Sequence, residues 1–340
     1  MPNLRQRLRE HPYALTVLAL AFAATAVLGI AGAYGFGHVG DALDQAEPAW
    51  LALIAAAEVV SYTAYVVAYR SIACVQGHDA IPTRVAARVV AAGFGPLAAG
   101  GGFALDKQAL HALHSDEDAA TVGVVGLGVL EWALLAPAAC ICAIAMLFQD
   151  GDGVWPSVLW PWAIAVPAGF ALGLIASTNP VRPRVCRLFG NPRWLGHLLE
   201  GVATLHTLVA QPRTFARAWI GTTVYWAADI AALYGGLRMF GVHPTPGMLI
   251  IGYATGYAAT RRSLPLAGAG VTEALMTYSL HWVGVPVAQA LCAVVAYRVF
   301  NFLLVLPPAL AARGRVQPLL DAARERRALT PTERRLSFGR

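Results

Sequence analysis

An uncharged apolar run near the amino terminus constrains the fold of this chain more than any other feature. It extends from Ala14 to Gly35 without a single charged residue. An α-helix rises ~1.5 Å per residue, so a run of this length crosses the ~30 Å hydrocarbon core of a bilayer. A cleaved signal peptide is the alternative, because Ala31-Gly32-Ala33 could be a cleavage site. The run is longer than the apolar core of an ordinary signal peptide, so we predict a membrane-spanning helix.

Five more apolar segments have the length of a membrane span, at about 50–69, 119–148, 157–177, 218–240 and 286–311. They predict an all-α polytopic membrane protein with about six spanning helices. Only 13% of the residues are charged, against about 25% in a soluble domain. The net charge of +6 comes from arginines between and after the apolar segments. We therefore expect no nucleic-acid partner.

The charges of the loops predict the side of the membrane on which each loop lies. The positive-inside rule places residues 1–12 in the cytoplasm and the acidic loops 38–48 and 149–156 outside. The arginine-rich segment 178–217 is predicted to be cytoplasmic. Leucines and valines at steps of three and four within it predict a helix on the membrane surface, with a linker helix packed on the bundle as the alternative. The basic tail 313–340 is expected to be cytoplasmic and partly disordered.

Two further apolar segments, 85–105 and 247–282, are interrupted by glycine and proline, so neither can form one regular helix. Irregular backbone at membrane depth must be buried in protein or line a wet cavity. Each segment therefore predicts a broken re-entrant hairpin, which enters the membrane and returns to the same side. The residues expected to break the helices are Pro96, Gly100, Gly101, Gly102, Pro265, Gly268 and Gly270.

The two broken segments contain related strings, Pro-Leu-Ala-Ala-Gly-Gly from Pro96 and Pro-Leu-Ala-Gly-Ala-Gly from Pro265. Each is preceded by a span with an acidic residue and followed by a span with one charge, at similar distances. Loop charges put the first hairpin on the cytoplasmic side and the second outside. We therefore predict an inverted repeat within a transmembrane domain at 13–312, with halves at about 50–148 and 218–311. Coincidence in an Ala- and Gly-rich chain is the alternative.

Charged residues inside the apolar segments are the candidates for a functional site, because a charge in the bilayer centre is costly unless it is paired or hydrated. The second break gives two hypotheses for Glu273 and Arg298: a structural clamp, or a Glu that orients the Arg toward a lipid phosphate. Lys107, the only lysine, is either part of the path or an interfacial anchor. The predicted lipid-headgroup or substrate path comprises Arg261, Arg262, Glu273, Arg298, Glu58, Glu131, Asp229, Asp106 and Lys107.

Glu58 shares a helical face with Tyr62, Tyr65 and Tyr69, which follow it at steps of four, three and four. An acid beside hydroxyl groups forms a polar stripe in a membrane helix. The stripe is either part of a headgroup path or a structural polar cluster between helices.

The stretch from Leu264 to Ala274 reads Leu-Pro-Leu-Ala-Gly-Ala-Gly-Val-Thr-Glu-Ala, and Gly284-Val285-Pro286 and Arg298 follow it. Here the sequence resembles the membrane region of lysylphosphatidylglycerol synthases and flippase-like membrane proteins, which carry a Leu-Pro, glycine-rich, Gly-Val-x-Glu-Ala pattern. The first hairpin departs from the family's Pro-Gly-x-x-Gly-Glu-x-x-Arg pattern. The resemblance implies the lipid-translocating part without the aminoacyl-transfer part, because no domain of acyltransferase size follows residue 312.

The sequence has no P-loop, HExxH or GxSxG motif, so we expect no enzymatic activity and no cofactor. The five cysteines lack metal-ligand spacing, so we expect no metal. The leading hypothesis is a multi-pass protein of the cell membrane that moves, or helps to move, an anionic phospholipid or polyprenyl-linked precursor between leaflets. Its partners would be membrane lipids and a lipid-synthesising enzyme. The alternatives are a proton-coupled transporter of a small solute, working through Glu58 or Asp229, and an accessory subunit of a lipid-modifying enzyme.

Overall fold

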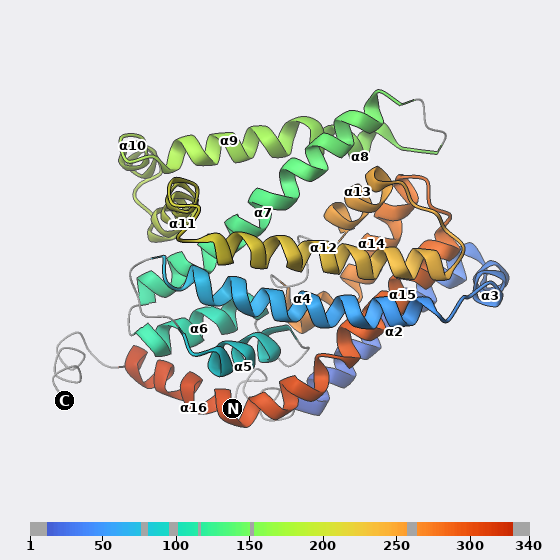
Figure 1. The fold of residues 1–340 in the computed structure, drawn as a ribbon, viewed down its shortest axis with the longest axis horizontal. Coiled ribbons are helices and arrows are strands. Elements are labelled where there is room, and N and C mark those ends of the chain that lie inside the picture. Colours follow the sequence, from blue (N-terminus) through green and yellow to red (C-terminus); the bar gives the residue numbers. More distant parts are fainter. Residues whose placement is uncertain are drawn as a thin grey trace.

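The computed structural model describes residues 12–75, 81–94, 101–114, 117–149, 153–256 and 264–328, and Figure 1 shows their arrangement. Within these ranges the chain is helical almost throughout and forms no β-strand beyond an isolated bridge between Val154 and Val283. Helices satisfy all their backbone hydrogen bonds internally, as a spanning segment in lipid must. The all-α membrane fold expected from the hydropathy pattern is confirmed.

Five helical stretches are long and apolar enough to cross a bilayer. Four of them are α2 (Pro12–Tyr34), α4 (Trp50–Ile72), α7 (Glu117–Leu147) and the series α8 (Pro156–Trp160), η1 (Pro161–Ala165) and α9 (Val166–Ser177). The fifth joins α15 (Val287–Leu303) to the start of α16 (Leu306–Ala328). The sixth expected span is α12 (Ala216–Met239), which has spanning length, with 24 residues, but is less apolar than those five.

The antiparallel pair of α4 and α12 forms the centre of the bundle (Figure 1). Gly221 of α12 lies against Ala64 and Ala68 of α4, whereas Gly235 lies against Ile54 near the other end. A Cβ atom at Gly221 would come within 2.7 Å of the Ala68 backbone nitrogen, so the helices touch backbone to backbone. Small residues allow this approach in membranes. These are the first helices of the two predicted halves, and they run in opposite directions.

Each predicted hairpin consists of two short helices that pack against each other between two long ones. The first pair is α5 (Thr83–Phe94) and α6 (Gly102–His114), between α4 and α7. The second is α13 (Pro246–Gly256) and α14 (Val271–Trp282), with the short η2 (Pro265–Gly268) before α14, between α12 and α15. Helices of this length fall short of the ~20 residues that a span needs. The residues between the arms, 95–100 and 257–263, lie outside the described residues.

Two peripheral helices pack on the outside of the bundle. The helix predicted on the membrane surface within 178–217 is α11 (Arg193–Ala210), preceded by α10 (Arg182–Leu188). It packs on α7 and α9, with Gly201 against Val125 and Thr204 against Gly126. Small residues on both helices permit this contact. Four leucines of the apolar stripe are buried, whereas Leu198 and Val209 are exposed.

The first part of the carboxyl-terminal tail belongs to a long helix. Residues 313–328 continue α16, which packs on both α5 and α6. Ala312 and Val316 of α16 form a small buried cluster with Ala92 of α5. The last helix therefore covers the first hairpin. At the other end of the bundle, α3 (Phe36–Asp44) packs on α2 and α15.

Candidate functional site

The polar centre of the protein is a short segment of α15. Tyr297, Arg298 and Asn301 are all buried, at 0%, 3% and 4% exposure. They lie within little more than one helical turn, and each binds an acidic side chain from a different helix. One segment thus holds Asp229 of α12, Glu273 of α14 and Glu58 of α4.

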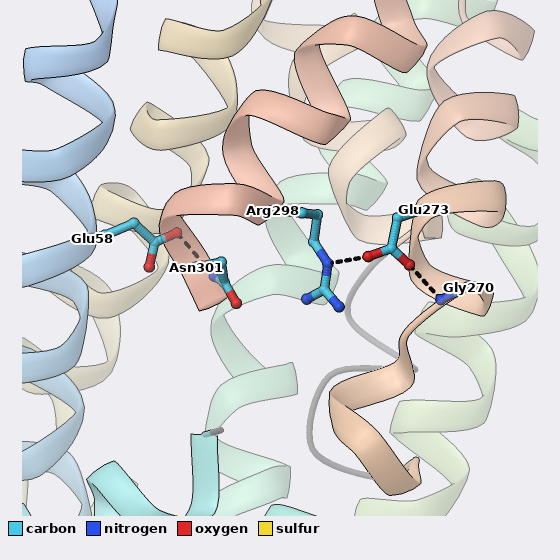
Figure 2. A network of polar contacts seen from close by, with 5 residues as sticks. All are labelled: Glu58, Gly270, Glu273, Arg298 and Asn301. Carbon is cyan, nitrogen blue, oxygen red and sulfur yellow. Dashed lines mark hydrogen bonds and ion pairs between the residues drawn. The ribbon is translucent and has the colours of Figure 1, made fainter. Parts of the chain in front are cut away.

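The first contact is an ion pair at the break of the second hairpin. Arg298 Nε donates to Glu273 Oε1 at 2.8 Å, and the other carboxylate oxygen accepts the backbone N–H of Gly270 at 2.6 Å (Figure 2). Gly270 has a φ of +83°, which favours glycine, and it immediately precedes α14. A carboxylate in the first turn also suits the positive end of the helix. Glu273 is therefore fixed by both the helix start and the arginine.

The guanidinium of Arg298 has a second neighbour and a definite direction. Its central carbon lies 4.6 Å from the centre of the Phe302 ring, in a cation–π contact. The Nε–H is used on Glu273, and the terminal amino groups point away from that carboxylate in Figure 2. Arginine carries five N–H donors in a planar fork that matches carboxylate and phosphate. The arrangement presents donors beside a helix amino terminus, which together suit an anionic group.

The second contact joins the two halves of the molecule. The Asn301 side-chain amide donates to Glu58 Oε1 at 2.9 Å (Figure 2). The backbone carbonyl of Asn301 also accepts a hydrogen bond of 3.5 Å from the Tyr62 hydroxyl. Tyr62 and Tyr65 both pack edge-on against Phe94 at the end of α5. The predicted polar stripe on α4 thus connects α15 to the first hairpin.

The third contact is a carboxylate held by two tyrosine hydroxyls. Asp229 is fully buried, and its Oδ2 accepts hydrogen bonds from Tyr253 of α13 and from Tyr297, the latter at 3.0 Å. Asp229 therefore connects the central helix α12 with an arm of the second hairpin and with α15.

The other predicted path residues are more scattered. Glu131 is buried on α7, where its backbone carbonyl accepts the indole N–H of Trp226. Asp106 is fully buried on α6. Lys107, next to it, lies 3.4 Å from Glu117 at the start of α7, and both are partly exposed. Lys107 is thus ion-paired with the first residue of α7, apart from the cluster on α15. Arg261 and Arg262 lie outside the described residues.

The predicted glycine breaks occupy equivalent places in the two hairpins. Gly101 has a φ of +84° and immediately precedes α6, as Gly270 precedes α14. Both lie at the same offset from their prolines. Gly102 is the first residue of α6 and Gly268, with a φ of +67°, ends η2, which begins at Pro265. Pro96 and Gly100 lie outside the described residues.

The residues that sequence reasoning missed are all uncharged. Asn301, Tyr253 and Tyr297 make the contacts that gather the acids, whereas the predicted path consists of charged side chains alone. Asn301 had a usable signal, because an amide three residues after an arginine in an apolar span also needs a polar partner. Within the described ranges no group of three or more His, Cys, Asp or Glu residues is placed to hold a metal ion.

A family model described as the lysylphosphatidylglycerol synthase TM region matches residues 15–309. The match includes both halves, both hairpins and every residue of the α15 cluster, and it confirms the resemblance seen around Leu264. A search of curated proteins gives no match.

Proposed function

This chain belongs to the family of lysylphosphatidylglycerol synthase transmembrane regions, and from that premise we propose that it moves an anionic phospholipid or lipid-linked precursor between leaflets. The family makes it a membrane protein of lipid metabolism or translocation. Our proposal assigns it the translocation step and no enzymatic one. Membrane lipids, and a lipid-synthesising enzyme that supplies them, are its proposed partners.

The observation that carries the proposal is the buried Arg298 at the break of the second hairpin. A buried charge in the bilayer is expensive, and its retention usually marks a substrate path or an ion-pair network. Here the terminal amino groups of the arginine point away from Glu273, next to the first turn of α14 (Figure 2). An interrupted helix whose amino terminus meets an anionic group is the way in which many transporters bind substrate near the midplane.

The test compares lipid transfer and thermal stability in the same variants. The probe is fluorescent phosphatidylglycerol in phosphatidylcholine vesicles, and transfer is read from its accessibility to an external quencher. We expect Arg298→Gln to reduce the transfer rate at least tenfold. The matched control is Arg238→Gln at the end of α12, where the arginine stacks on Trp50 and transfer should persist.

A double variant, Glu273→Arg combined with Arg298→Glu, distinguishes binding of a lipid phosphate by Arg298 from a purely structural ion pair. Removing one member of a buried pair costs about 3–5 kcal/mol of stability, because the other charge is stranded. The exchanged pair should recover much of that stability but not transfer, since a carboxylate now stands where the phosphate binds. Recovery of both stability and transfer would show that Arg298 does not contact the lipid.

A further inference from the structure

We infer that Asp229 is the site at which a proton binds to drive the lipid movement proposed above, and this inference rests on that proposed function. Asp229 lies in the middle of α12, fully buried in the bundle. A carboxyl group changes its charge when it binds a proton, and intramembrane acids commonly serve as proton relays in transporters. The hydrogen bonds that Asp229 accepts connect such a change of charge to α13 and α15.

Both tyrosine hydroxyls donate to one oxygen of the carboxylate, Oδ2. Hydrogen bonds to an ionised acceptor are roughly twice as strong as those between neutral groups. When the carboxylate takes up a proton, the charge that strengthens both bonds is lost and the carboxyl group gains a donor of its own. The contacts that tie α13 and α15 to α12 therefore weaken together.

The two contacts lead to the phosphate site by separate routes. Tyr297 directly precedes Arg298 on α15, so its position affects the guanidinium. Tyr253 lies on α13, which is bound to α14 by a hydrogen bond of 2.7 Å from Ser279 Oγ to the Gly252 carbonyl. The two arms are in close backbone contact, because a Cβ atom at Gly256 would lie 2.4 Å from the Met276 Cα. Movement of α13 must therefore carry α14 and Glu273 with it.

Several ionisable groups face α12 from the helices packed against it. Glu58 lies on α4 between the two glycine contact points, as Asp229 does on α12. Its carboxylate is bound by an amide, which does not titrate, whereas Asp229 is bound by hydroxyls from the hairpin and from α15. Of these two acids, Asp229 is thus the one that is hydrogen-bonded both to the second hairpin and to the residue that precedes Arg298. The facing groups are Glu58 on α4, Glu131 on α7, Tyr253 on α13, and Tyr297 and Arg298 on α15.

The experiment measures the steady-state distribution of fluorescent phosphatidylglycerol between leaflets, with a gradient of one pH unit of either sign. If one proton moves with each lipid, the inner-to-outer ratio can change by up to about tenfold. A protonophore should return the ratio to its value without a gradient. In Asp229→Asn the gradient should leave the ratio unchanged, whereas the exposed control Asp44→Asn should respond like the native protein.

A second variant keeps the inference testable if Asp229→Asn moves no lipid. Tyr253→Phe retains the carboxyl group but removes one donor to its ionised form. The pH of half-maximal transfer should rise by at least half a unit. The control is Tyr234→Phe, on α12 but away from Asp229, in which this pH should not change. An unchanged pH profile in Tyr253→Phe would overturn the inference.

The outcomes for the two proposals differ. A native protein that moves no lipid would refute translocation itself. Lipid movement that ignores the pH gradient, or a gradient response that survives in Asp229→Asn, would refute proton binding at Asp229 and leave translocation standing.

Discussion

At the scale of single residues, the site depends on neutral groups as much as on charges. The pairing of Glu273 with Arg298 could be expected from the sequence, because Glu273 directly follows the glycine break and Arg298 is the charged residue of the next apolar span. The partners of Glu58 and Asp229 could not be expected in the same way. Tyrosine and asparagine within apolar helices are also common in ordinary packing, and only the three-dimensional arrangement shows that they meet acids.

Gly270 is the residue whose backbone is most constrained at the site. With a φ of +83°, an alanine would be strained, and its Cβ would lie 3.0 Å from the Phe22 carbonyl oxygen of α2. We expect Gly270→Ala to lower the free energy of unfolding by about 1–3 kcal/mol and to reduce lipid transfer. Thermal melting in detergent measures the first effect and vesicle transfer the second.

The matched control is Gly196→Ala in α11, where a Cβ would meet no atom within 4 Å. Replacing a helical glycine of this kind by alanine should raise the free energy of unfolding by about 0.5–1 kcal/mol. Equal stability changes at the two positions would contradict the role assigned to the conformation of Gly270.

At the scale of helices, the long spans and both hairpins followed from hydropathy and from the glycine and proline breaks. The packing partners of α11 and α16 could not be predicted in this way. An apolar stripe indicates that one face of a helix is buried, but it does not indicate which element buries it. Leu195, Leu199 and Leu208 read equally well as lipid-facing, yet they are buried. The neighbouring helix α7 offers Val125 and Gly126 as a complementary surface, which becomes visible only in the fold.

The contact between α4 and α12 gives a prediction at this scale. A side chain at Gly221 would lie 2.7 Å from the Ala68 nitrogen and 2.9 Å from the Ala64 carbonyl oxygen, neither of which can move without shifting a helix. We expect Gly221→Ala to cost about 1–3 kcal/mol, as overpacking does. In Gly123→Ala of α7 the new Cβ would meet only Leu110 Cδ1, at 3.5 Å, so its melting temperature should stay near that of the native protein.

At the scale of the whole molecule, loop charges predict which way the bundle lies in the membrane. We expect the amino terminus, the loop 178–217 and the tail on the cytoplasmic side, because their arginines favour that side. In a background without the five native cysteines, Asp44→Cys should react with an impermeant thiol reagent in intact cells. Arg187→Cys should react only after permeabilisation, and both positions are exposed. The reverse labelling pattern would invert the predicted topology.

The hydrogen bond between Asn301 and Glu58 joins residues 243 positions apart in the chain. A ribosome delivers α4 to the membrane long before it has synthesised α15, so Glu58 enters without the amide that will finally hold it. Until then Glu58 must interact with water, lipid headgroups or the insertion machinery, because an isolated acid is poorly tolerated in hydrocarbon. The order in which the helices are made therefore differs from the order in which the core can close, and the native arrangement is completed only when the last span arrives.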